Sequence, residues 1–178
     1  EGGETELDKN VIEELRDPLM HIIRNSADHG IELPDVRRKN NKNETGTIAL
    51  KAEHSGANVR ISITDDGNGL DRDAIIAKAL QSGLIASPDI DDHTAYSLIF
   101  EPGFSTAANT TDISGRGVGM DVVKKNVDKL RGTIDIRTEK GNGTTFSISI
   151  PLTLAIIDGF MIESGAMKYV FNLSLVRE

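Results

Sequence analysis

Two pairs of short alternating segments, each pair joined by a glycine-containing turn, constrain the fold of this chain more than any other feature. Apolar and polar residues alternate within each segment. Alternation with a period of two gives a strand one buried face, so each pair predicts an antiparallel hairpin that must be covered on one side. The predicted strands are 47–53 with 59–64 around the turn 55–58, and 132–139 with 144–150 around the turn 140–143.

Helical segments supply the cover that these hairpins need. In 7–29, apolar residues recur at spacings of three and four and form one stripe. Pro18 interrupts this segment, and either a kink or a new helix capped by Asp17 fits the sequence. Gly30 is a natural C-terminal stop. Helices segregated from antiparallel hairpins predict an α+β sandwich. Further helices are expected at 34–40, 71–83, 91–100 and 118–130.

A change in the pattern at Pro151 divides the chain. Two more alternating segments, 154–162 and 168–175, follow it. A two-stranded unit has little core of its own, so 152–178 is expected to be the opening hairpin of a second domain. The chain has no initiator Met and no visible signal peptide, which favours a piece of a larger protein.

Composition excludes several classes of function. With 38% hydrophobic and 27% charged residues, the chain is typical of a soluble globular protein, and no apolar run approaches the roughly 18 residues of a membrane span. It has no cysteines, so disulfides and thiolate metal sites are excluded, which is compatible with the cytoplasm. The net charge of −8 argues against nucleic-acid binding and requires any phosphate site to be built locally.

The first segment with candidate ligand-binding residues lies at the end of the first helix. His21, Asn25, Asp28 and His29 are spaced to project from one helical face, beside the apolar stripe. The amide oxygen of Asn25 suits a Mg²⁺ ion whose remaining ligands are phosphates and water. Arg24 is able to reach a phosphate. The alternative is a solvated helix face that carries two histidines by chance.

The second and third segments follow strand ends. Asp65 begins the sequence D-D-G-N-G, and its carboxylate is suited to accept a hydrogen bond from an adenine amino group. Gly67 and Gly69 allow the backbone to approach a ligand closely. In 141–146, hydroxyls such as that of Thr144 would bridge to Asp65 through water. Each segment taken alone also fits an ordinary turn.

The fourth segment, G-R-G-V-G-M-D at 115–121, runs into a helix. Backbone N–H groups at a glycine-rich helix N-terminus form an anion site. Its G-x-G-x-G spacing fits neither a dinucleotide fold nor a Walker-type loop. The preceding segment, 102–117, lacks periodicity and has the length of a functional lid. A flexible hinge is the alternative.

In this order, H-x-x-x-N-x-x-D-H, D-D-G-N-G, P-G-F-S-T and G-R-G-V-G-M-D resemble the four conserved boxes of the GHKL ATPases. That superfamily includes gyrase-type ATPases, chaperone ATPases and histidine kinases. The runs DPLMHIIRNSADHGIE, EPGFST and SGRGVGMDVVK are similar to the catalytic domain of the chemotaxis histidine kinase family CheA, and PLTLAIIDG resembles its junction with the regulatory domain.

The resemblance implies a fold and a domain division. The fold is a two-layer sandwich of a mixed, mostly antiparallel sheet with helices on one face. Residues 1–151 would form the ATP-binding kinase catalytic domain, and 152–178 the truncated opening hairpin of a regulatory adaptor-binding domain. ATP and Mg²⁺ are the implied cofactors.

The resemblance also assigns roles to residues. Asn25 would bind Mg²⁺, Asp65 would contact adenine, and the catalytic set of His21, His29 and Asn25 would lie near the γ-phosphate. Lys78 is expected to contact phosphate, although an exposed helix lysine fits equally well. The residues expected to contact the nucleotide are Arg24, Asn25, Asp28, Asp65, Gly67, Gly69, Lys78, Gly115, Arg116, Gly117, Val118, Gly119, Met120 and Thr144.

One position separates the branches of the superfamily. Hydrolytic members carry a Glu four residues before the Asn, where this chain has His21. An imidazole is able to orient a phosphate or move a proton, so this position favours transfer to protein over rapid hydrolysis. A hydrolytic ATPase and a non-enzymatic nucleotide-binding module remain the alternatives.

The resemblance finally implies partners. The expected activity is transfer of the ATP γ-phosphoryl group to a histidine on a separate phosphoacceptor domain. The full-length protein would be a cytoplasmic homodimer that works with response regulators, a coupling adaptor and chemoreceptors. The present chain is expected to be monomeric, because it shows no dimer-forming helices, and to bind neither nucleic acid nor membrane.

Overall fold

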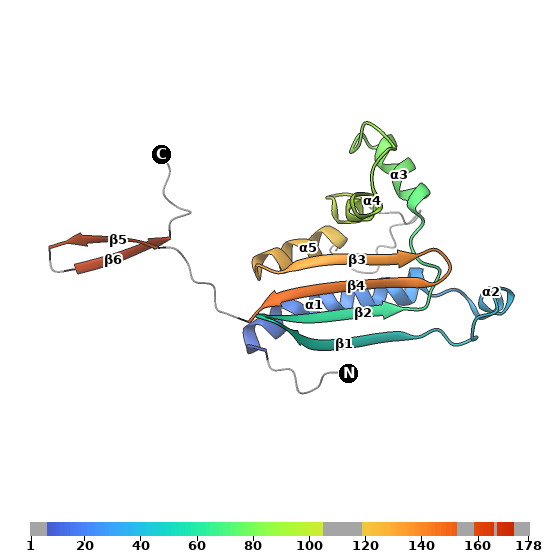
Figure 1. Ribbon diagram of the computed structural model, residues 1–178, viewed down its shortest axis with the longest axis horizontal. Coiled ribbons are helices and arrows are strands. Elements are labelled where there is room, and N and C mark those ends of the chain that lie inside the picture. The colour runs from blue at the N-terminus through green and yellow to red at the C-terminus, as the bar shows by residue number, and fades with distance from the viewer. Residues whose placement is uncertain (1–6, 105–118, 153–158, 166, 173–178) are drawn as a thin grey trace.

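A computed structural model describes residues 7–104, 119–152, 159–165 and 167–172 of the 178-residue chain. Its main sheet has four strands in the order β1-β2-β4-β3 (Figure 1). Both predicted hairpins are confirmed, and β2 pairs with β4 to join them. All three pairings are antiparallel, so the sheet in the described residues is not mixed. The strands are β1 (Ile48–Ser55), β2 (Asn58–Asp65), β3 (Thr133–Glu139) and β4 (Gly143–Pro151).

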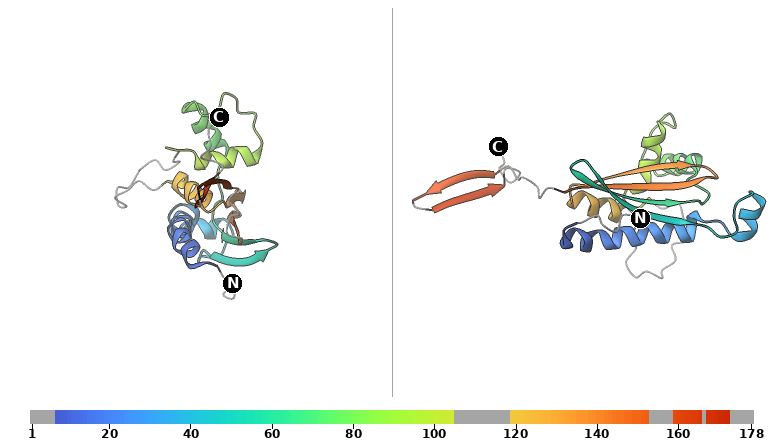
Figure 2. Two further views of the ribbon diagram at one scale, coloured as in Figure 1. Left: turned by 90° about the vertical axis from the view of Figure 1, so that its left-hand side faces the viewer. Right: turned by 60° about the horizontal axis from the view of Figure 1, so that its bottom comes forward.

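The helices confirm the predicted α+β class. Helices α1 and α5 contact each other and lie on one face of the sheet (Figure 2). The helical elements are α1 (Lys9–Asn25), η1 (Ser26–Gly30), α2 (Pro34–Lys39), α3 (Arg72–Gln81), α4 (Asp92–Ser97), η2 (Leu98–Phe100) and α5 (Met120–Lys129). None of the helices in the described part of the chain combines the length and apolar character needed for a membrane span.

Helix α1 begins at its N-cap Asp8, whose carboxylate accepts a hydrogen bond from the Asn10 amide at 2.8 Å. It then runs through Pro18 without interruption. The alternative of a second helix capped by Asp17 is therefore wrong. Pro18 is buried, so the ring packs against the core while the helix continues on either side.

The register of β2 and β4 builds the core and also positions the site. Val59, Ile61 and Ile63 face the helices and lie opposite Ile150, Ile148 and Phe146. Residues two apart on a strand share a face, so the same face continues to Asp65 and its partner Thr144. The last step of an apolar face is thus a buried polar pair. The buried residues that the helices contribute to this core include Leu15, Ile22, Ile75, Ala79, Val123 and Val127.

Strands β5 (Gly159–Ser164) and β6 (Met167–Asn172) form a separate two-stranded antiparallel sheet. A hairpin was predicted here, with strands at 154–162 and 168–175. The described strands are shorter, and 153–158 and 173–178 lie outside the described residues. Assignment of 152–178 to a regulatory domain stays a prediction.

Candidate nucleotide-binding site

A cavity of about 410 Å³ lies where the polar end of the sheet meets the end of α1 and the start of α5. One part of its wall is polar and comes from the segments that the sequence singled out. The other part is apolar and comes mainly from α3 and the segment that ends at Phe104. The polar part contains His21, Asn25, Ser26, His29, Gly30, Asp65, Gly69, Asp71, Gly119 and Thr144, and the other wall residues are Leu70, Ala74, Ile75, Ile99, Phe104, Met120 and Phe146.

Asp65 is the most firmly held polar group of this wall. Its side chain is only 4% exposed. One carboxylate oxygen accepts a hydrogen bond from Ser26 Oγ at 2.8 Å. The other accepts from the amides of Gly67 at 3.1 Å and Thr144 at 3.2 Å. Two distant segments and the turn that follows Asp65 therefore fix one carboxylate.

The contacts of Asp65 differ from the prediction in detail. The turn at 141–146 was expected to reach Asp65 through hydroxyls and water, but the backbone amide of Thr144 donates directly. The hydroxyl comes from Ser26, which the sequence analysis missed. Thr144 Oγ1 instead lies 3.1 Å from Thr138 Oγ1.

Glycines permit close approach of the loops around Asp65. A Cβ on Gly67 would lie 2.1 Å from the carbonyl oxygen of Gly30, which accepts a hydrogen bond from the Asn68 amide at 2.8 Å. Gly143 has a φ of 105°, and its Cβ would lie 2.0 Å from the carbonyl oxygen of Asp65. Both contacts are far shorter than any side chain tolerates. Gly67 does not line the cavity, but its position beside Asp65 admits only glycine for a steric reason. Its contact with the nucleotide stays a prediction.

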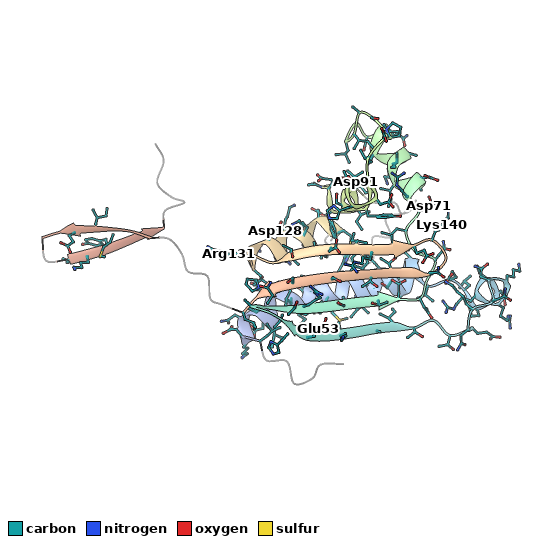
Figure 3. All side chains as sticks on the ribbon, viewed as in Figure 1. Glu53, Asp71, Asp91, Asp128, Arg131 and Lys140 are labelled. Atoms are coloured by element: carbon teal, nitrogen blue, oxygen red, sulfur yellow. The ribbon has the colours of Figure 1, made fainter. Side chains whose placement is uncertain are left out.

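The start of α3 is tied to the β3–β4 turn at the edge of the cavity. Asp71, the N-cap of α3, accepts a hydrogen bond from the Ala74 amide at 3.1 Å. Its other oxygen accepts from Lys140 Nζ at 2.6 Å (Figure 3). The Lys140 bond, followed by the Ala74 amide, holds the pKa of Asp71 below its ordinary value. This ion pair joins the apolar wall to the sheet.

His21, Asn25 and His29 all line the cavity, as the helical spacing predicted. The Asn25 amide nitrogen donates to Met120 Sδ at 3.2 Å, which leaves the amide oxygen as the acceptor of that side chain. Burial, assisted by the positive charge of Arg24, lowers the pKa of His21 below 6.5, and Asp121 opposes the shift. Burial and Arg24 thus both favour the neutral form of the imidazole.

Two residues of the first segment lie outside the cavity wall. After Asn25 the helix widens into a π-helical turn, in which the Ile31 amide bonds to the Ser26 carbonyl at 2.8 Å. A π turn changes the angular spacing, so an α-helical period does not extend through 26–30. Asp28 is exposed and does not line the cavity, contrary to the expected shared face. Arg24 is also exposed and off the wall.

The remaining predicted residues divide into two groups. Lys78 does not line the cavity, but its Nζ lies 5.7 Å from the ring centroid of Phe104, which does. Gly119 and Met120 line the cavity at the start of α5. Gly115, Arg116, Gly117 and Val118 lie outside the described residues, as does most of the predicted lid at 102–117.

Comparison with known proteins identifies the family. Residues 14–154 match the family model described as histidine kinase-, DNA gyrase B- and HSP90-like ATPase. The chain belongs to this ATPase family. The match covers every described wall residue of the cavity, and the name of the family makes ATP the nucleotide expected there.

Individual relatives narrow the likeness. The chain is 49% identical over 177 residues to "Chemotaxis protein CheA" of Salmonella typhimurium, covering 99% of this chain and 26% of that protein. It is 52% identical over 181 residues to "Sensor histidine kinase CheAY" of Helicobacter pylori, and the alignment covers 100% of this chain and 22% of that protein. It is 48% identical over 180 residues to "Chemotaxis protein CheA" of Bacillus subtilis, and the alignment covers 99% of this chain and 27% of that protein. The chain spans about a quarter of the length of these relatives.

Proposed function

We propose that this chain is the ATP-binding catalytic domain of a CheA-like protein-histidine kinase. It transfers the γ-phosphoryl group of ATP to a histidine on a separate phosphoacceptor domain, as part of bacterial chemotaxis two-component signalling. The observation that carries the proposal is the 49% identity to a chemotaxis kinase along 99% of the chain. The cavity, which lies within the family match, supplies the chemistry.

Adenine binds at the Asp65 end of the cavity. The carboxylate accepts three hydrogen bonds from the protein and has acceptor capacity left for the adenine amino group. The apolar wall that includes Leu70, Ile75 and Phe104 suits the faces of a purine. Gly67 and Gly69 shape this end of the site, with Thr144 bonding the carboxylate from the opposite strand.

The phosphates lie toward His21, Asn25 and the start of α5. Asn25 fits a Mg²⁺ site because its amide oxygen is a hard, neutral ligand and its amide nitrogen is already engaged by Met120. The remaining ligands of the ion would be phosphate oxygens and water. When bound, the ion neutralises phosphate charge.

His21 and His29 serve the phosphoryl end of the reaction. The lowered pKa of His21 favours the neutral imidazole, which is able to accept a proton or orient a phosphate oxygen. Hydrolytic members of the superfamily carry a Glu at the position of His21, and this chain has no carboxylate there to activate water. The site therefore favours positioning an acceptor histidine over activating water.

The remaining contacts complete the proposal. Arg24 and Lys78 would reach the phosphates from outside the wall, and Arg116 with the amides of 115–119 from the lid. Asp28 stays a predicted nucleotide contact. In the cell, the full-length protein would be cytoplasmic and homodimeric. Its partners would be response regulators, a coupling adaptor and chemoreceptors, while the present chain is monomeric.

Labelled ATP supplied with a separate CheA-type acceptor domain tests the proposal. Acid-labile label should accumulate on the acceptor histidine and not on this chain. Asn25→Ala should abolish the transfer while leaving the fold intact by circular dichroism. High turnover without an acceptor would favour a hydrolytic ATPase, and tight binding without transfer would favour a non-enzymatic module. Stable histidine phosphorylation of the chain itself would contradict the separation of kinase and acceptor.

A further inference from the structure

A group of four charged side chains, centred on one buried arginine, contacts the loop that follows Asp65. It consists of Glu32, Arg37, Lys42 and Asp66. None of these residues lines the cavity, and the sequence analysis gave none of them a role. Two positive and two negative charges balance within the group, so it is neutral as a whole.

Arg37 is the centre of this group. Its side chain is only 1% exposed, and it bonds through all three guanidinium nitrogens. Nη1 donates to Glu32 at 3.0 Å and to the Asp66 carbonyl at 3.2 Å, and Nη2 donates to the Asp66 carboxylate at 2.9 Å. Nε donates to the carbonyl oxygen of Asn43 at 2.6 Å. The planar fork of an arginine is required to meet all these acceptors at once.

Lys42 fixes the same loop from a second direction. Its Nζ donates to the carbonyl oxygens of Asp66 at 2.8 Å and Gly67 at 2.6 Å. It also pairs with Glu32 at 2.8 Å. Glu32 therefore bridges the two cations. Burial alone would raise the pKa of Glu32, but the bonds from Lys42 and Arg37 hold it below its ordinary value.

Every polar group of Asp66 is engaged by a neighbouring segment. Its amide donates to the Thr47 carbonyl at 3.2 Å, and its second carboxylate oxygen accepts from the Thr47 amide at 2.9 Å. Its carbonyl oxygen accepts hydrogen bonds from Lys42 and Arg37, and its first carboxylate oxygen accepts one from Arg37. Because Asp66 and Gly67 are covalently next to Asp65, fixing them also fixes the turn in which the Gly67 amide bonds to Asp65.

The energetics of such a group indicate positioning rather than stability. A buried set of ion pairs recovers little more than its desolvation cost, so apolar side chains of similar volume would stabilise the fold equally well. Apolar side chains, however, would not hold the carbonyl groups of Asp66 and Gly67 and the Asp66 carboxylate in one orientation. Small errors in the orientation of a binding group are costly for recognition.

We propose that Arg37 and Lys42 are positioning residues for base recognition: they hold Asp66 and Gly67 so that the Asp65 carboxylate meets the adenine amino group. This inference rests on the proposed function, because it requires that Asp65 reads the base. Its consequence is that selectivity for ATP over GTP depends on two cations that do not touch the nucleotide.

Binding of ATP and GTP to the 178-residue chain, measured by isothermal calorimetry with Mg²⁺ and non-hydrolysable analogues, tests the inference. Arg37→Met and Lys42→Met should each lower ATP affinity about tenfold and leave GTP affinity within about twofold. Arg37→Lys should recover part of the loss. The matched control is Arg38→Met, since Arg38 is exposed and pairs with Asp35 and Glu44 on the surface.

A double-substitution cycle distinguishes positioning from a general structural role. In an Asp65→Asn background, Arg37→Met should change the ATP-to-GTP preference by less than about twofold, because the group it positions is gone. Equal effects in both backgrounds would overturn the inference, as would an unchanged preference in Arg37→Met and Lys42→Met. If Arg37→Met does not fold by circular dichroism, the Lys42→Met result decides, since Lys42 is more exposed. A lack of ATP preference in the unmodified chain would instead contradict the proposed role of Asp65.

Discussion

Asp65→Asn is the most direct test of how the cavity recognises a base. The substitution preserves shape and removes one negative charge. Asn Oδ1 is still able to accept from the amides of Gly67 and Thr144. Asn Nδ2 takes the place of the oxygen that accepts from Ser26 Oγ, and a hydroxyl is able to accept as well as donate. The contacts of the fold are therefore retained.

The loss should appear in nucleotide binding. In the proposed complex a carboxylate oxygen of Asp65 accepts from the adenine amino group, whereas the variant would present an amide N–H₂ there. A hydrogen bond to a charged group contributes about 1.5–3 kcal/mol. That corresponds to roughly a ten- to 150-fold loss of ATP affinity. Guanine carries a carbonyl in place of the amino group, so the affinity of the variant for GTP should rise or stay unchanged.

Calorimetric titration of both proteins with ATP and GTP analogues measures the change, and urea unfolding measures whether stability is kept. Ser26→Ala is the companion variant, because it removes one bond to Asp65 and leaves the carboxylate in place. It should weaken ATP binding by less than Asp65→Asn. Equal binding of ATP and GTP by the unmodified chain would refute the reasoning, as would an unchanged ATP affinity in Asp65→Asn.

Three further outcomes follow from the geometry. Gly67→Ala should weaken ATP binding and lower the unfolding free energy by about 1–3 kcal/mol, because the new Cβ would lie 2.1 Å from a carbonyl oxygen. The matched control is Gly56→Ala, in a hairpin turn where the new Cβ would meet nothing within 4 Å. That variant should bind ATP with unchanged affinity. Because the pKa of His21 is lowered in the folded chain, the unfolded chain binds a proton more readily, and the unfolding free energy should fall as the pH drops below about 6.5. Urea unfolding between pH 7.5 and 5.5 measures this fall, and the part due to His21 should be absent in His21→Gln. Ile148→Ala should cost about 2–5 kcal/mol by urea unfolding, because that side chain is 1% exposed in the core, and a cost below 1 kcal/mol would contradict this.

Much of the fold was predictable because local pattern and tertiary packing agree. The alternation in the strands that became β2 and β4 marks the residues that face α1 and α5. Helices were expected at 71–83 and 91–100, and α3 and α4 begin one residue after Asp71 and Asp91, which cap them. The pairing of β2 with β4, which joins the two hairpins, was not predicted. Nothing in one hairpin encodes which edge of the other it meets, because the pairing joins residues about 80 positions apart.

The site residues that could be predicted are those whose side-chain type alone suggests a role. Asn25 and Asp65 could be nominated from sequence, and both line the cavity. Ser26 could not, because an α-helical period places it about 100° away from Asn25 on the helix surface. Its burial does follow the helical period, since Ser26 lies four residues after the buried Ile22. The sequence does not show that Asp65, at the end of β2, comes within 2.8 Å of its hydroxyl. Asp28 was placed on the wall by the same assumption of a regular helix.

The buried charges around Arg37 were the least predictable part, for a physical reason. The sequence of α2 and the loop after it is strongly polar, which is typical of a solvated surface. Arg37 is buried and Arg38 is exposed, although the two are neighbours of one type. Burial of one guanidinium requires partners for its charge, and one of them, Asp66, comes from the end of β2, far from Arg37 in the sequence.

The register of the sheet links the core to the site. Asp65 lies two residues beyond Ile63 on the face that packs against the helices, opposite Thr144. A slip of one residue between β2 and β4 would move Asp65 to the outer face together with every apolar side chain of β2. The free energy of burying Val59, Ile61 and Ile63 therefore also holds the carboxylate at the cavity. Since Gly143 packs its backbone against the Asp65 carbonyl, the β3–β4 turn fixes this register at the point where the nucleotide is expected to bind.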